Sequence, residues 1–259
     1  MTPLESRHAL GMRLDKTSYR DAASRIAAWA RNAESRYVCV ATVHMVMEAH
    51  DLAAFRRQVN AADLVTPDGV PLVWTLRLMG ARGASRVYGP DLMLRVLAEA
   101  EREGLPVGFY GGTPEVLEIL LQSLRGRFPD LRVAYGWSPP FRPLSAEEDE
   151  RVTEEIHASG VRILFVGIGC PKQERWMAEH RGRLDAVMLG VGAAFDFVAG
   201  VKPQARPWMQ NLGLEWLFRL ATEPRRLWRR YLKQNPRFMA YLALELLGLR
   251  QFPREASSR

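Results

Sequence analysis

Cysteine is scarce in this sequence of 259 residues. The two that occur, Cys39 and Cys170, lie far apart and lack the spacing of metal ligands. Such a pair favours buried, reduced thiols and argues against a disulfide framework or a zinc site. We therefore expect a protein of a reducing compartment, the cytoplasm.

Long apolar runs are missing as well. The first 15 residues contain no apolar core of the kind that a secretory signal peptide needs. No stretch reaches the roughly 18 uncharged apolar residues that cross a bilayer, and the nearest, residues 238–249, carries Glu245. The sequence predicts a chain that does not cross a membrane by itself.

Positive charge is unevenly distributed. Hydrophobic residues make up 47% and charged residues 25% of the chain, which is typical of a globular protein with one large core. Residues 201–259 contain 12 Lys and Arg against 4 Asp and Glu, whereas the rest of the chain is close to neutral. Trp208, Trp216 and Trp228 lie in the same basic segment. This asymmetry indicates that the last part of the chain has a function of its own.

Up to about residue 200, short β-branched or aromatic runs alternate with longer stretches of helical periodicity. The predicted strands are Tyr37–Thr42, Asp63–Thr66, Val107–Tyr110, Arg132–Tyr135, Ile163–Val166 and Ala186–Gly190. The predicted helices are Ser18–Arg31, Met45–Asn60, Val70–Met79, Asp91–Glu103, Pro114–Arg127, Ala146–Ala158 and Pro171–His180. This order predicts an α/β fold, a Rossmann-like parallel sheet with helices on both faces, whose ligands bind beyond the carboxyl ends of the strands.

After Gly200 the pattern changes to two or three basic amphipathic helices, which we expect to be broken at Pro224 and Pro236. We therefore divide the chain into a core, residues 1–200, and a helical appendage, residues 201–259. Tryptophan beside arginine on such helices suits an anionic membrane surface. Nucleic acid is the less favoured partner for this charge, because the core is near neutral and lacks a nucleic-acid-binding motif.

Two glycine loops follow predicted strands and precede helices. Gly111-Gly112-Thr113-Pro114 has a natural helix cap and first helical residue, so its free N–H groups suit an anion, although an ordinary loop would look the same. In the second loop, residues 167–174, two glycines precede Lys172 and Gln173. A dinucleotide site would need a third glycine, so a nicotinamide-dependent oxidoreductase is disfavoured.

Polar residues also end two strands. Thr42 and His44 lie at the end of the predicted strand Tyr37–Thr42. Asp68 lies in Thr66-Pro67-Asp68-Gly69, at the end of the next predicted strand. Taken alone, Pro-Asp-Gly is a turn signal, but a carboxylate at a strand end can also accept a proton from an attacking hydroxyl. Arg86 suits either a phosphate or a solvated surface.

Taken together, these segments resemble the WecG/TagA/CpsF glycosyltransferase family. The resemblance rests on six ordered motifs between about residues 35 and 240. They are ADLVTPDG at 62–69, RVYGPDL at 86–92, FYGGTPEV at 109–116, ILFVGIGCPKQERW at 163–176, VGAAFDFVAG at 191–200 and a basic tryptophan-containing segment at 208–238.

The resemblance implies a metal-independent, inverting transferase without a cofactor, peripheral on the cytoplasmic face of the membrane. Its donor would be a UDP-sugar and its acceptor an undecaprenyl-pyrophosphate-linked sugar. The family's catalytic base falls on Asp68, and its substrate-binding residues fall on Thr42, Arg86 and Gln173. Among the appendage residues, Arg219, Arg225 and Arg226 are candidates for neutralising the departing diphosphate.

The chain departs from many members at His44, where they have asparagine, and at Val70-Pro71, which replaces a glycine-containing segment. Both changes indicate a branch similar to the xanthan-assembly glucosyltransferase. The sequence leaves open a non-catalytic protein that binds a nucleotide sugar or a polyprenyl phosphate. It also leaves open isologous dimers or a larger homo-oligomer.

Overall fold

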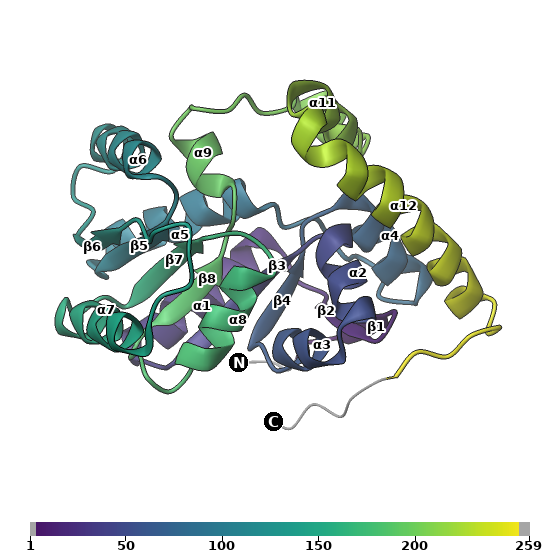
Figure 1. Cartoon of the computed structure of the whole chain (residues 1–259), viewed down its shortest axis with the longest axis horizontal. Coiled ribbons are helices and arrows are strands. Elements are labelled where there is room, and N and C mark those ends of the chain that lie inside the picture. The colour runs from purple at the N-terminus through teal and green to yellow at the C-terminus, as the bar shows by residue number, and fades with distance from the viewer. Residues whose placement is uncertain (1–3, 254–259) are drawn as a thin grey trace.

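The computed structural model describes residues 4–253, apart from the side chains of Pro207 and Asn211. At the centre of this part lies a six-stranded, all-parallel sheet in the order β4-β3-β8-β7-β5-β6 (Figure 1). The strands are β3 (Arg36–Ala41), β4 (Leu64–Pro67), β5 (Val107–Gly111), β6 (Val133–Trp137), β7 (Ile163–Gly167) and β8 (Val187–Gly190). All six were predicted from the sequence, within two residues at each end.

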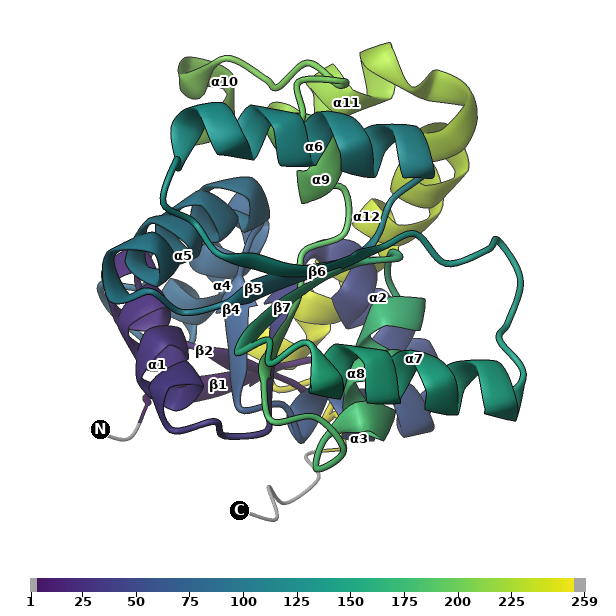
Figure 2. The ribbon, with the colours of Figure 1, turned by 90° about the vertical axis from the view of Figure 1, so that its left-hand side faces the viewer.

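Helices cover both faces of the sheet, as Figure 2 shows along the β6 edge. One face carries α1 (Tyr19–Arg31), α5 (Gly89–Glu103), α6 (Pro114–Arg127) and the short α9 (Ala194–Val198). The other carries α2 (Val43–Asp51), α3 (Ala53–Asn60), α7 (Ala146–Ala158) and α8 (Lys172–His180), and α4 (Val70–Leu78) follows the edge strand β4. The α/β, Rossmann-like prediction is confirmed.

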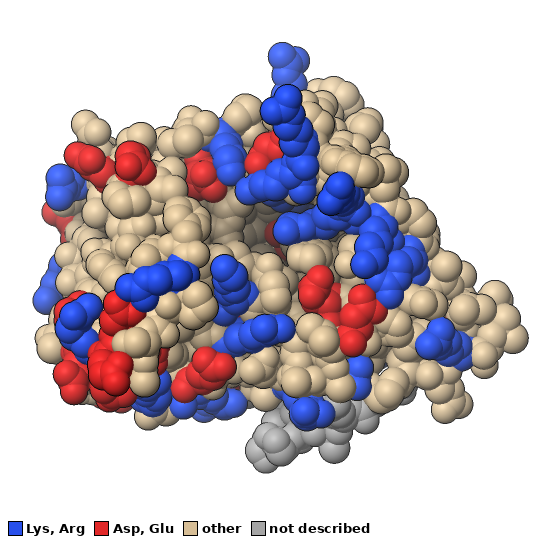
Figure 3. Space-filling model, viewed as in Figure 1, with Lys and Arg blue, Asp and Glu red and all other residues tan. Residues whose placement is uncertain are grey.

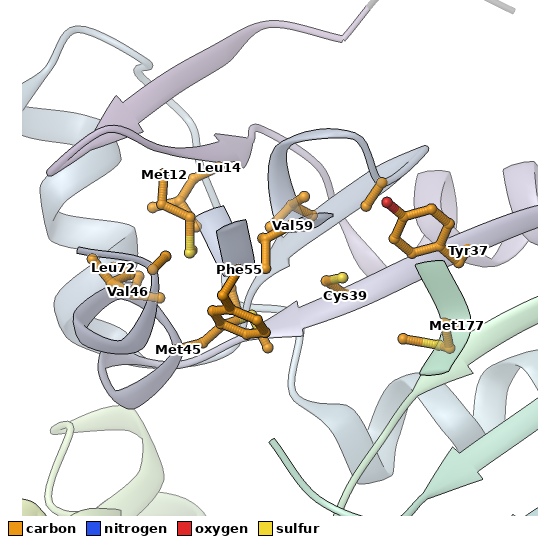
Figure 4. Close-up of a cluster of buried hydrophobic side chains, with 14 of the residues drawn as sticks. Met12, Leu14, Tyr37, Cys39, Met45, Val46, Phe55, Val59, Leu72 and Met177 are labelled. Atoms are coloured by element: carbon orange, nitrogen blue, oxygen red, sulfur yellow. The ribbon is translucent and has the colours of Figure 1, made fainter. Parts of the chain in front are cut away.

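The core divides into two clusters because successive side chains of a strand point to opposite faces. In β3, Val38 and Val40 join the cluster beneath α1 and α5, whereas Tyr37 and Cys39 join the cluster beneath α2 and α3. In the second cluster Phe55 packs close to Met45 and Val59 (Figure 4). Strand β3 is therefore held from both sides, and its carboxyl end has a well-defined position.

An antiparallel hairpin of β1 (Ser6–Ala9) and β2 (Met12–Asp15) was missed from the sequence. Each strand has four residues, and the turn uses Leu10 and Gly11, both with positive φ. Leucine rarely adopts that conformation, so the turn carries no recognisable sequence signal. The single helix predicted for residues 45–60 is likewise two helices, because Leu52 has an extended backbone.

The appendage forms α10 (Pro207–Asn211), α11 (Glu215–Thr222) and α12 (Pro224–Leu246). The predicted break at Pro224 is confirmed, but the predicted break at Pro236 is wrong, because α12 continues through it. A proline inside a helix costs about 3 kcal/mol. Just beyond it, the buried side chains of Phe238 and Leu242 pack into the core cluster and offset that cost.

Helix α12 lies along α2 and reaches as far as the hairpin (Figure 1). Arg237 forms an ion pair with Asp51 at 2.6 Å, and Glu245 accepts a hydrogen bond from the backbone N–H of Leu10 at 2.9 Å. Within residues 4–253, none of the helices has both the length and the apolar character needed to span a membrane.

Candidate active site

A cavity of about 340 Å³ opens at the carboxyl ends of β3 and β4, beneath the appendage. In the view of Figure 3 a hollow lies near the middle of the molecular surface. Lysine and arginine side chains lie along the margin that the appendage forms. Its polar and charged lining residues include Thr42, His44, Asp68, Arg86, Gln210, Glu215, Arg219, Arg230, Tyr231, Gln234 and Asn235. The strand ends form its floor, and α11 and α12 form its wall.

Thr42 and His44 reach the cavity because β3 ends directly before them. Thr42 has an extended backbone and caps α2, where its hydroxyl accepts a hydrogen bond from the N–H of Met45 at 3.4 Å. His44 follows in the first turn, and its buried Nδ1 has no hydrogen-bond partner; Glu48 Oε1 is 3.7 Å away. Burial, together with the charge of Arg230, lowers the pKa of His44 to about 4, so its imidazole is neutral at pH 7.

Asp68 is held at the end of β4, where its backbone N–H donates to the carbonyl of Ala41 at 2.9 Å. Its side chain is 16% exposed and lines the cavity. Burial raises the pKa of Asp68 to about 7, and the carboxylate of Glu215 acts in the same direction, whereas Arg86 and Arg219 oppose it. The carboxyl group therefore changes its protonation near neutral pH.

Arg86 is fixed beside Asp68 by several contacts. Its Nε donates to the backbone carbonyl of Asp68, and its guanidinium lies over the ring of Tyr88, 4.4 Å from the centroid. Its Nη2 donates to Asp68 Oδ1 at 3.3 Å and also to Glu215 Oε2. Burial lowers the pKa of Arg86, but the two carboxylates outweigh it and keep the pKa above its ordinary value. Arg86 is therefore a permanent cation.

The cavity wall contributes further positive charge. Arg219, from α11, has a buried Nε without a hydrogen-bond partner, and its guanidinium lies 5.6 Å from the ring centroid of Phe197. Arg230, from α12, borders the same space. Among the described lining residues, three arginines therefore face two carboxylates, which favours an anionic ligand.

Four of the predicted binding residues lie at the same edge of the sheet but outside the lining of the cavity. Gly111 ends β5 and Gly112 follows it, and Lys172 and Gln173 begin α8 after β7. Gly111 has a φ of 134°, and a Cβ there would come within 2.5 Å of the Gly167 carbonyl carbon. Glycine at this position therefore permits the close approach of the ends of β5 and β7. This packing accounts for a glycine at position 111 without a ligand.

Gln173 is buried and Lys172 is exposed. Gln173 Oε1 accepts a hydrogen bond from the Gly169 N–H at 3.2 Å, and its Nε2 donates to Glu174 Oε1 at 2.7 Å. Burial raises the pKa of Glu174 to about 7, and its Oε2 has no hydrogen-bond partner. Gln173 thus links the loops that follow β7 and β8, next to Gly190.

Arg225 and Arg226 also lie outside the cavity lining, on the exposed first turn of α12. Arg226 forms an ion pair with Glu223 at 2.7 Å. Glu215, Arg230 and several uncharged wall residues also line the cavity but were not predicted from the sequence. For Glu215 a signal exists, since it is the single acidic residue between Gly200 and Thr222.

Within residues 4–253, no group of three or more His, Cys, Asp or Glu side chains is arranged to hold a metal ion. The site thus combines a buried carboxyl group that titrates near neutral pH with arginines suited to phosphate, where a parallel sheet receives its ligands. Residues 7–252 match the glycosyl transferase WecG/TagA/CpsF family. The chain therefore belongs to the WecG/TagA/CpsF family of glycosyltransferases, enzymes of cell-surface polysaccharide synthesis.

Proposed function

We propose that this protein is an inverting, metal-independent glycosyltransferase with Asp68 as its general base. It transfers a sugar from a UDP-sugar to an undecaprenyl-pyrophosphate-linked sugar. The observation that carries the proposal is the position of Asp68, a largely buried carboxyl group in a cavity at the strand ends, beside a fixed arginine. Asp68 takes the proton of the acceptor hydroxyl, whose oxygen attacks the anomeric carbon while UDP leaves from the opposite side.

The protonation of Asp68 suits this role. A general base is most effective when its pKa lies near the working pH, because it is then both deprotonated and strongly basic. Burial raises the pKa of Asp68 to about 7, well above the ordinary value of an aspartate. The imidazole of His44 is neutral and has an unpaired buried nitrogen, so we assign it, with Thr42, to hydrogen bonds with the donor sugar.

The departing diphosphate needs compensating positive charge. In a cavity largely shielded from water, fixed cations stabilise such charge more strongly than they do in solution. We assign this role to Arg219 and Arg230 together with Arg86, since all three line the cavity. Gly111, Gly112, Lys172 and Gln173 border the same sheet edge, and we place them at the outer part of the donor site.

A lipid-linked acceptor requires an enzyme that reaches the membrane surface. The appendage exposes Trp208, Leu212, Trp228, Leu232 and Met239. Exposed cations lie on α12 beside these side chains. Each lysine or arginine near an anionic membrane contributes about 1 kcal/mol. We therefore propose peripheral binding to the cytoplasmic membrane face through α10 and α12; a homo-oligomer is the competing use of the same surface.

The test is turnover of Asp68→Asn with a panel of UDP-sugars and a lipid-linked monosaccharide, read as UDP release and product mass. Loss of a general base lowers kcat by about 10²–10⁴-fold. Asp51→Asn is the matched control, because that aspartate pairs with Arg237 on the surface, outside the cavity lining. Turnover of Asp68→Asn close to wild type would remove the base assignment.

Two further arms separate the alternatives. A chelator should leave wild-type turnover intact; loss of turnover that magnesium restores would contradict the metal-independent mechanism. A non-catalytic binding protein would bind UDP-sugar equally well with Asp68 or Asn at this position and would release no UDP with any acceptor.

A further inference from the structure

Glu215 is an unexpected residue in the wall of the cavity. It begins α11 in a strongly basic segment, and its side chain is only 13% exposed. Burying a carboxylate is costly unless it is paired. Its ion-pair partner is Arg86, which belongs to the loop before α5 and lies 129 positions away in the chain. This ion pair joins the appendage to the catalytic core at the site itself.

The contacts of Arg86 leave its guanidinium only partly engaged with Asp68. The Nε and the Tyr88 ring fix its position against the backbone of Asp68, as described above. Towards the Asp68 carboxylate it offers Nη2 alone, at 3.3 Å from Oδ1, and the same nitrogen also donates to Glu215. The structure gives Asp68 Oδ2 no hydrogen-bond partner among the described residues. From the described side chains, the Asp68 carboxylate thus accepts a hydrogen bond on Oδ1 alone.

An arginine beside a single carboxylate usually forms two parallel hydrogen bonds to it. With Glu215 absent, the Arg86 Nη2 that the two carboxylates now share would donate to Asp68 alone, while Nε stays on the backbone carbonyl of that residue. The Asp68 carboxylate would then accept an unshared hydrogen bond from a cation and would be a poorer acceptor for a proton. Glu215 prevents this by competing for the guanidinium.

We propose that Glu215 is a positioning residue for the transfer reaction: it binds Arg86 and so keeps the Asp68 carboxylate available to the acceptor hydroxyl. This inference rests on the proposed role of Asp68 as the base. The appendage would then take part in the chemistry as well as in ligand binding. The Asp68 carboxylate would be available only while α11 is packed against the core and Glu215 contacts Arg86.

The charges that face Asp68 support the same conclusion. Arg86 and Arg219 lower the pKa of Asp68, and Glu215 raises it. Arg230 adds a further cation from α12, and His44 on α2 is neutral. Glu215 is therefore the anion among these groups, and its removal would leave cations alone around the base. The pKa of Asp68 would then fall towards its ordinary value.

The experiment compares the pH profile of kcat/KM for wild type, Glu215→Gln and Glu223→Gln. For wild type we expect kcat/KM to rise with pH through about 7, as Asp68 loses its proton. For Glu215→Gln this rise should move to lower pH, and the plateau should fall about tenfold because a weaker base is a poorer catalyst. Glu223→Gln is the matched control: Glu223 pairs with Arg226 and Lys202, outside the cavity lining, so its profile should keep the wild-type midpoint.

A Glu215→Gln profile with the wild-type midpoint would overturn the inference, whether or not its plateau is lower, since a merely structural ion pair would reduce activity equally at every pH. If Glu215→Gln does not fold, Glu215→Asp replaces it; the shorter side chain should give a smaller shift in the same direction, and no shift would again overturn the inference. If Asp68→Asn is inactive and the Glu215→Gln profile keeps the wild-type midpoint, the proposed function stands and only the role of Glu215 is contradicted. If Asp68→Asn is active, the proposed function fails first.

Discussion

At the scale of single residues, two buried carboxyl groups have a pKa near 7 but occupy different surroundings. Asp68 lies in the cavity among arginines, whereas Glu174 lies beneath the loop after β7 with one oxygen unpaired. For both, burial favours the neutral form. A raised pKa in the folded state means that the group lowers stability as the pH rises from its ordinary pKa to the raised one, above which the loss is constant. Both residues therefore make the protein less stable at neutral pH than in mild acid.

We predict that Asp68→Asn is more stable than wild type above pH 7. In the wild type the folded pKa of about 7 exceeds the ordinary value of 3.8, so stability falls as the pH rises between these values. Asparagine does not ionise, so its advantage should be full above about pH 7 and should vanish near pH 4. Thermal unfolding at pH 5 and pH 8 checks this, and a Tm difference that is the same at both pH values would contradict it.

The composition of the site was partly predictable at this scale. Thr42, Asp68 and Arg86 converge because β3 and β4 are neighbours and their carboxyl ends meet. Gly111 ends β5, which lies three strands from β3, and at about 4.8 Å per strand this places it some 14 Å away. Strand order depends on contacts between distant segments, so the sequence could not separate these loops. Glu215 was missed for the same reason, because its partner is remote in the chain.

At the scale of elements, the six sheet strands were predictable because each is a short apolar run bounded by turn residues and followed by a helix. The hairpin was not, because its stability depends on tertiary contacts. Arg13 and Asp15 form a buried ion pair at 3.2 Å, and Asp15 accepts a hydrogen bond from the Val65 N–H at 2.8 Å. Because two of the four residues of β2 are charged, a search for apolar residues does not identify it as a buried strand.

Helix α12 departs from its local sequence preference at Pro236, and this leads to a prediction. Pro236→Ala should stabilise the protein, because alanine restores a backbone hydrogen bond within the helix. The gain should be about 1–2 kcal/mol, less than the full propensity difference, since proline also restricts the unfolded chain. Denaturant unfolding measures it. An unchanged or lower midpoint would mean that the packing of Phe238 depends on proline at position 236.

At the scale of the whole molecule, positive charge and exposed apolar side chains are concentrated on the appendage, while the core is near neutral. The appendage also forms one wall of the cavity. The proposed membrane contact and part of the candidate active site therefore belong to the same segment of the chain. Docking on an anionic surface would therefore orient the cavity relative to the lipid-linked acceptor, which is confined to that surface.

We predict that binding to vesicles containing anionic lipid weakens as salt is added, because the attraction acts within the Debye length. The double variant Arg229→Gln, Lys233→Gln removes two exposed charges of α12 that do not line the cavity. It should bind such vesicles about 30-fold less tightly, at roughly 1 kcal/mol per charge. Sedimentation with vesicles measures this, with neutral vesicles as the control. Equal binding by the double variant would exclude α12 as the contact.

The hydrogen bond between Leu10 and Glu245 has a consequence for synthesis of the protein. Because α12 is bound to the first hairpin and also forms a wall of the cavity, a ribosome that has made only the sheet and its covering helices has not yet made the complete cavity. The nascent core emerges with the strand ends uncovered, and its hairpin still lacks this tether. The cavity is complete only when α12 has left the exit tunnel and has packed against the segments that were translated first.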